Sequence, residues 1–287
     1  MKRSTIIFLI FAVVLIITGI ILCVVGNAKA ESEFNSMSIS EGNQLFRQVK
    51  DSDGNLVETI NLSDEVLNKI NIDVSEANVN VYGNSDVCYV QIINFNAIEY
   101  SAYTNNRSFT IENDLISAMI NRVSGGDIGY NGLRDYFRLT KSNDKKEINI
   151  YLTDQNDIKI FDISVGEGDI NFDSIGTISD YNINLKKGNV TYKNTAEISK
   201  ISANVENGNI ELNGLFANQG IIEIGSGDLT LSSPKDVSYS YDLTVEVGEI
   251  KIGEEIFKGS HKTESNESGG TFTANVEVGN IKIKFDE

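Results

Sequence analysis

The sequence predicts an all-β fold, a β-solenoid of stacked rungs of about 20 residues each, preceded by one N-terminal transmembrane helix. Three observations predict it. A glycine-centred motif recurs at nearly constant spacing, apolar and polar residues alternate on both sides of each glycine, and an uncharged apolar run lies near the N-terminus. The chain has 287 residues, which is enough for a sizeable core.

The first element is the apolar run Thr5–Val25, which contains no charged residue. As a helix it would be about 31 Å long, the thickness of the hydrocarbon core of a bilayer. Lys2 and Arg3 precede it, so we expect a cytoplasmic N-terminus and an extracytoplasmic body held by a single pass through the cell membrane. The alternative is a signal peptide that is cleaved near Ala30, which would release a secreted protein. Residues 1–30 are therefore a cytoplasmic tip with an anchor or signal segment.

Residues 31–68 are polar and poorly periodic, and we interpret them as a spacer or cap. The β-strand-repeat domain covers residues 69–287. Its first half contains four strand-like runs, at residues 70–82, 87–95, 108–113 and 147–152. Residues 115–143 are less regular and are interpreted as an insertion or surface loop.

The glycine motif becomes regular after residue 159. Its glycines are Gly168, Gly188, Gly208, Gly227, Gly248 and Gly279, at spacings of 20, 20, 19, 21 and 31 residues. The long last interval contains a polar insertion, residues 253–270. The segment "VSEANVNV" at Val74–Val81 resembles an earlier copy in which Ala77 replaces the glycine.

Each glycine is expected to mark a sharp corner between two short strands, with a positive φ that glycine adopts without steric cost. The residue after each glycine is polar. If the copies stack as rungs, these residues form a column at a spacing of roughly 4.8 Å, in which neutral asparagines separate the acids. The column consists of Asp169, Asn189, Asn209, Asp228, Glu249 and Asn280.

The runner-up architecture is a meander of antiparallel hairpins. Asn207–Gly208, between two alternating runs, is a good hairpin signal. Only one of the six copies has this dipeptide, whereas glycine followed by Asp, Asn or Glu occurs in all six. The repeat therefore favours stacked rungs, because one rung alone cannot bury its apolar face.

The copies "DISVGEGDINF" and "SANVENGNIELNG" and the entry segment "KINIDVSEANVNVY" resemble a bacterial β-strand-repeat family of unknown function whose members are labelled "putative adhesins". The resemblance covers residues 69–287. It implies a right-handed β-helix-like fold, an N-terminal membrane anchor and an extracytoplasmic location. The family has no established catalytic residues, so the resemblance implies none here.

The composition excludes several kinds of chemistry. The net charge of −17 disfavours binding to nucleic acid or to anionic lipid surfaces. The chain has one histidine and two cysteines, of which Cys23 lies in the apolar run and Cys88 in a strand-like run. We expect no internal disulfide, no catalytic residue, no metal site and no cofactor.

The sequence therefore predicts a non-catalytic, membrane-anchored binding or scaffold module that contacts an unknown envelope protein or glycan. Tyr130, Tyr136 and Phe137 in the irregular stretch are candidates for an aromatic contact patch. One alternative is an envelope-stress sensor that acts through a membrane partner. A less favoured alternative is a β-helix enzyme that acts on polysaccharides.

Overall fold

The computed structural model describes residues 48–63, 65, 67–95, 100–113, 145–153, 158–176, 178–193, 197–213, 216–234, 239–264 and 270–286. All regular structure in these residues is β-strand, and they contain no helix that is long and apolar enough to cross a bilayer. The apolar run Thr5–Val25 and the irregular stretch of residues 115–143 lie outside the described residues. The membrane span and the loop therefore stay predictions.

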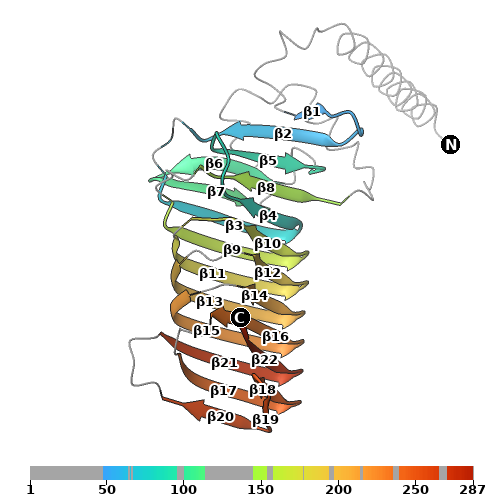
Figure 1. Ribbon diagram of the computed structural model, residues 1–287. Helices are drawn as coiled ribbons and strands as arrows, with labels where there is room; N and C mark the ends of the chain where they lie inside the picture. The colour runs from blue at the N-terminus through green and yellow to red at the C-terminus, as the bar shows by residue number, and fades with distance from the viewer. Residues whose placement is uncertain are drawn as a thin grey trace, which may run out of the picture.

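The strands form two sheets that face each other across the core (Figure 1). The twelve-stranded sheet has the spatial order β1 (Gln48–Lys50), β2 (Leu56–Asn61), β5 (Tyr89–Ile93), β8 (Glu147–Tyr151), β4 (Asn78–Tyr82), β10 (Ile170–Asp173), β12 (Val190–Lys193), β14 (Ile210–Asn213), β16 (Leu229–Pro234), β22 (Ile281–Asp286), β18 (Ile250–Ile252) and β19 (Glu255–Phe257). The ten-stranded sheet has the order β20 (Ser260–Thr263), β17 (Ser240–Val247), β21 (Thr271–Val278), β15 (Phe216–Ser226), β13 (Glu197–Asn207), β11 (Ile178–Lys187), β9 (Ile160–Glu167), β3 (Lys69–Glu76), β7 (Ser108–Glu112) and β6 (Ser101–Asn105).

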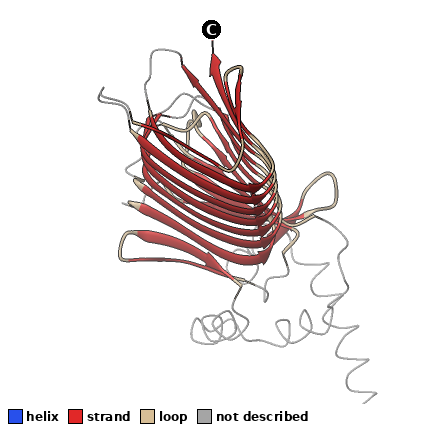
Figure 2. Ribbon diagram, turned by 90° about the horizontal axis from the view of Figure 1, so that it is seen from below, coloured by secondary structure: helices blue, strands red, loops and turns tan. Residues whose placement is uncertain are grey.

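Each rung contributes one strand to each sheet, and neighbouring rungs pair in parallel. In the rung of β9 and β10, Ile163 pairs with Ile183 of β11 and Ile170 pairs with Val190 of β12, so both strands are shifted by one 20-residue repeat. Viewed from below, the rungs lie over one another with the two sheets facing each other (Figure 2). The repeat region is therefore a stack of rungs and not an antiparallel meander. The right-handed sense that the resemblance implies stays a prediction.

The spatial order of the rungs departs from the order along the chain near the C-terminus. The last rung, β21 and β22, lies between the rung of β15 and β16 and the rung of β17 and β18. A stack in simple chain order is therefore wrong at this point. The copy centred on Ala77 does form a rung, since β3 and β4 pair in parallel with β9 and β10.

The N-terminal end of the stack is closed by antiparallel pairs. β5 pairs with both β2 and β8, β1 extends β2, and β6 pairs with β7. β1 and β2 belong to the segment that the sequence indicated as a spacer or cap. β6, which lies between two of the predicted runs, was not predicted.

The C-terminal end is closed by the segment that the sequence indicated as an insertion on the scaffold. Within residues 253–270, β19 pairs antiparallel with β18, and β20 pairs antiparallel with β17. These strands therefore form the last strand of each sheet, so the insertion between two rungs also closes this end of the stack. Phe257 packs against the core there, and its ring centroid lies 3.8 Å from that of His261.

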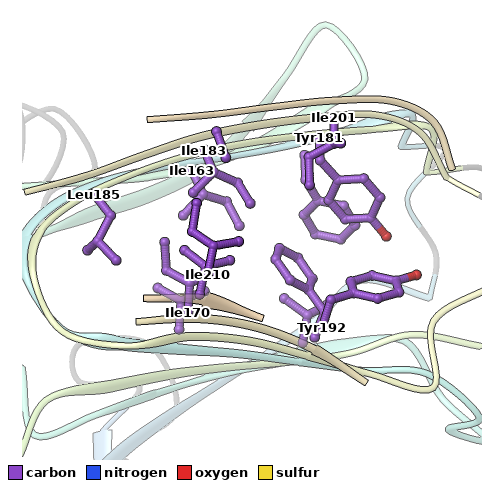
Figure 3. Packing of buried hydrophobic residues seen from close by; sticks show 14 of the residues in the cluster. Ile163, Ile170, Tyr181, Ile183, Leu185, Tyr192, Ile201 and Ile210 are labelled. Carbon is purple, nitrogen blue, oxygen red and sulfur yellow. The ribbon is translucent and has the colours of Figure 1, made fainter. Parts of the chain in front are cut away.

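The core lies between the sheets and is filled by the inward-facing half of each alternating strand. Ile163, Ile170 and Ile210 are at most 1% exposed (Figure 3). Full burial of such a side chain contributes roughly 1.5–3 kcal/mol. In the rungs of β9/β10 and β11/β12 aromatic rings continue the packing, as Tyr181 stacks on Phe161 at 5.6 Å and lies edge-to-face with Tyr192 at 5.9 Å.

Candidate functional site

The corner glycines form a column in which successive rungs nearly touch. Their φ values lie between 138° and 152°, in the region that favours glycine, for Gly168, Gly188, Gly208, Gly227, Gly248 and Gly279. A Cβ on Gly208 would lie 1.6 Å from the carbonyl oxygen of Gly188. Glycine is therefore required at Gly208 both by the backbone angle and by the close approach of the neighbouring rung. Ala77 at the first corner is not among the residues with positive φ.

The polar residues after the glycines form a hydrogen-bonded ladder, which we call the corner ladder. The backbone N–H of Asn189 donates to Oδ1 of Asp169 at 2.9 Å, and the N–H of Asn209 donates to Oδ1 of Asn189 at 3.0 Å. The N–H of Asp228 continues the series by donating to Asn209 at 2.8 Å. Each side chain thus satisfies a backbone donor of the next rung.

The corner ladder follows the spatial order of the rungs. The N–H of Asn280 donates to Asp228 at 2.8 Å, and the N–H of Glu249 donates to Oδ1 of Asn280 at 3.2 Å. Asn280 therefore lies between Asp228 and Glu249. One further member, Asn78, was not predicted from the sequence, and its Oδ1 accepts from the N–H of Asp169 at 3.0 Å. Its signal was present in "EAN", which matches "EGD" and "KGN" at the following corners.

The corner ladder is a structural element more than a binding site, because its oxygens accept hydrogen bonds from within the chain. Oδ1 of Asp169 accepts from both the backbone and the side-chain amide of Asn189, and Oδ1 of Asp228 does the same with Asn280. The part of the chain that the structure describes contains no cluster of three or more His, Cys, Asp or Glu side chains suited to a metal ion.

The predicted contact patch of Tyr130, Tyr136 and Phe137 lies outside the described residues and stays a prediction. A different set of tyrosines forms a row on the outer face of the twelve-stranded sheet. Strand register brings them together, because Tyr151 of β8 pairs with Tyr89 of β5 on one side and with Tyr82 of β4 on the other.

We call Tyr82, Tyr89 and Tyr151 the tyrosine row. The centroid of the Tyr151 ring lies 4.4 Å from that of Tyr89 and 5.1 Å from that of Tyr82, with interplanar angles of 11° and 24°. All three side chains are half-buried. Burial raises the pKa of Tyr82 and of Tyr151, and the carboxylate of Glu147 adds to the shift in both. The hydroxyls of Tyr82 and Tyr151 are therefore held in the neutral form.

A row of amides runs beside the tyrosines on the same face. Nδ2 of Asn80 donates to Oδ1 of Asn149 at 2.8 Å, and Nδ2 of Asn171 donates to Oδ1 of Asn80 at 2.9 Å. These bonds fix the orientation of the side chains on β4, β8 and β10. The sequence signal was the repeated pattern of one asparagine between two apolar residues, V-N-V, I-N-I and I-N-F, but only the strand register shows that the three asparagines are adjacent.

The ten-stranded sheet carries a shallow hollow on its outer face. It is centred on Gly225, which has no side chain, and is lined mainly by polar and acidic side chains, including Glu206, Glu223 and Glu277. No basic or aromatic side chain lines it. The tyrosine row is therefore the better candidate contact surface among the described residues.

The chain is similar in fold to several solved structures. One is a "putative cell adhesion protein" from Clostridium sporogenes, with 16% identity, a TM-score of 0.44, and coverage of 81% of this chain and 99% of that one. Another is a "putative adhesin" from Bacteroides fragilis, with 15% identity, a TM-score of 0.44, and coverage of 82% and 99%. No curated protein matches the chain in sequence.

A family assignment rests on most of the repeat region. The match extends over residues 67–285, from just before β3 to the residue before the end of β22, and it includes every corner glycine and the tyrosine row. The chain therefore belongs to the Toastrack DUF4097 family.

Proposed function

We propose that this protein is a non-catalytic binding module of the bacterial envelope and that the tyrosine row is its contact surface for a protein partner. The observation that carries the proposal is the stacking of Tyr82, Tyr89 and Tyr151 on an outer sheet face. Tyrosine supplies a large apolar body with a polar tip, and it is enriched in protein interfaces.

The ring geometry favours a protein partner over a glycan. Because Tyr151 is stacked on both sides, its ring faces are covered by Tyr82 and Tyr89. The row therefore offers ring edges and hydroxyls more than open aromatic faces. The neighbouring amides are fixed by hydrogen bonds, so a partner meets an ordered surface, which lowers the entropic cost of binding.

The disposition of reactive side chains supports a non-catalytic role. His261 lies at the opposite end of the stack against Phe257. Burial raises the pKa of the Cys88 thiol, which lowers the fraction of reactive thiolate. We place the body outside the membrane on the basis of Lys2, Arg3 and the apolar run that follows them.

The proposal is tested by binding of the purified full-length chain, in detergent, to envelope proteins of its own cell and to an array of envelope glycans. We expect binding to a protein, with affinity at least about tenfold weaker for Tyr82→Ser/Tyr151→Ser, since buried interface tyrosines often contribute more than about 1.4 kcal/mol. Tyr103→Ser, on the ten-stranded sheet, is the matched control and should bind like the parent.

Equal affinity of the double variant and the parent would remove the tyrosine row as the contact surface. Binding to a glycan in place of a protein would contradict the choice of partner. Turnover of any glycan, lost on substitution of a single carboxylate, would contradict the non-catalytic role.

A further inference from the structure

The rung of β21 and β22 fills a slot between two rungs that precede it in the chain. β15 and β17 do not pair with each other, and each pairs with β21. On the other sheet, β16 and β18 are likewise joined only through β22. The slot is thus bounded by unpaired strand edges on both sheets until β21 and β22 occupy it.

The rung of β21 and β22 fills the slot closely. Phe272 pairs with Gly220, and a Cβ on Gly220 would lie 2.3 Å from the Phe272 ring. The missing side chain at Gly220 therefore makes room for the ring. The other inward-facing residues of the rung are at most 2% exposed: Ala274, Val276, Ile281 and Ile283.

Backbone hydrogen bonds and the corner ladder complete the recognition on both sides. The N–H of Gly227 donates to the carbonyl of Val278, and the N–H of Gly279 donates to the carbonyl of Val247, both at 2.9 Å. Asn280 bridges the corner ladder between Asp228 and Glu249. All of these contacts are made by residues of the rung itself.

The segment that joins β20 to β21 is polar in sequence. β20, which precedes β21 in the chain, pairs with β17 and not with β21. Residues 264–270 join them, and their sequence, Glu-Ser-Asn-Glu-Ser-Gly-Gly, contains no apolar residue. The contacts of the slot are therefore the same whether the rung belongs to the same molecule or to another copy.

We propose that the slot also accepts β21 and β22 of a second copy, so that two molecules pair by reciprocal exchange of this rung. The exchanged pair keeps every contact described above. Closure within one molecule is favoured by its high effective concentration, and exchange is favoured where copies are crowded together.

The test uses two full-length copies with different tags, expressed in the same cell, each with Cys23→Ser and Cys88→Ala. One copy carries Glu223→Cys and the other carries Asn275→Cys. These positions are register partners on the outer faces of β15 and β21, and both are exposed. In two closed molecules the two thiols belong to different chains and do not meet. Exchange places them on neighbouring strands, within reach of a disulfide.

The matched control uses Asn184→Cys in one copy and Asn204→Cys in the other. These residues are register partners on β11 and β13, in rungs that follow one another in the chain. We expect a disulfide-linked band containing both tags for the 223/275 pair and none for the 184/204 pair. Absence of that band, or equal bands for both pairs, would overturn the proposal.

Discussion

At the residue scale, the corner glycines carry the most specific requirement. We expect Gly208→Ala to lower the free energy of unfolding by about 2–4 kcal/mol, from a strained φ together with a clash against Gly188. Gly54→Ala has a φ of 87° with open space around it, so it measures the strain alone, at about 1 kcal/mol. The free energy of unfolding of each variant is measured by denaturant titration followed by circular dichroism.

Gly176→Ala, which meets nothing within 4 Å and has no positive φ, is the control and should be nearly neutral. A loss of stability at Gly208 no larger than the loss at Gly54 would show that the close approach of rungs is tolerated.

The corner glycines could be predicted from the sequence, because each corner depends on a few neighbouring residues and the same pattern recurs in six copies. The tyrosine row could not be predicted, because Tyr89 and Tyr151 become neighbours only through pairing of strands distant in sequence.

At the element scale, the corner ladder keeps its carboxylates apart, because at least one amide lies between any two of them. Asn189 donates its side-chain amide to Asp169, so Asn189→Asp loses this donor and places two carboxylates on adjacent rungs. The neighbouring charge raises the pKa of the new carboxyl in the folded state. Because the pKa of this carboxyl is higher in the folded than in the unfolded protein, the variant has its full stability below the unfolded pKa of about 3.9. It loses stability as the pH rises above that value and the carboxyl ionises.

We therefore expect Asn189→Asp to be destabilised relative to the parent at pH 7 and to approach the parent below about pH 4. The check is urea denaturation across this range, with Asn189→Ala as the control, because it removes the amide without adding a charge. A deficit of Asn189→Asp that is independent of pH would contradict repulsion as the cause.

At the scale of the whole molecule, the core excludes ionised tyrosine. The hydroxyls of Tyr181, Tyr192 and Tyr241 are buried with no hydrogen-bond partner among the described residues, and burial raises the pKa of all three. Below the unfolded pKa of about 10, these tyrosines are neutral in both states and the folded protein keeps its full stability. As the pH rises above that value, ionisation favours the unfolded chain, so the free energy of unfolding falls. We expect cooperative unfolding above about pH 10, with a simultaneous rise in tyrosinate absorbance.

The triple variant with phenylalanine at these positions should unfold at higher pH than the parent, because no buried hydroxyl remains to ionise. Tyr103→Phe, at a position that is 36% exposed, is the control and should leave the midpoint unchanged. Identical alkaline midpoints for the triple variant and the parent would contradict this account.

The stacking of rungs could be predicted from the repeat, but the order of the last two could not. Two segments of nearly identical sequence could pair with β15 and β16, namely "VEVGEIKI" at residues 245–252 and "VEVGNIKI" at residues 276–283. The choice is made in the tertiary structure, where Phe272 lies against Gly220 and pairs with Tyr241 of β17, and no local pattern reveals it. The end strands β19 and β20 were not predicted within the insertion, since a polar segment that closes a core resembles a loop.

The corner ladder also makes the height of the molecule adjustable in fixed steps. Each rung presents the same donor to one neighbour and the same acceptor to the other, 20 residues apart along most of the stack. Loss of residues 189–208 would bring the N–H of Asn209 to Oδ1 of Asp169, where the N–H of Asn189 lies now. In-frame duplication or loss of one such unit would lengthen or shorten the stack by about 4.8 Å, the spacing of neighbouring strands. Gain or loss of whole repeats can thus change the distance between the two ends of this protein while the strands that close each end stay the same.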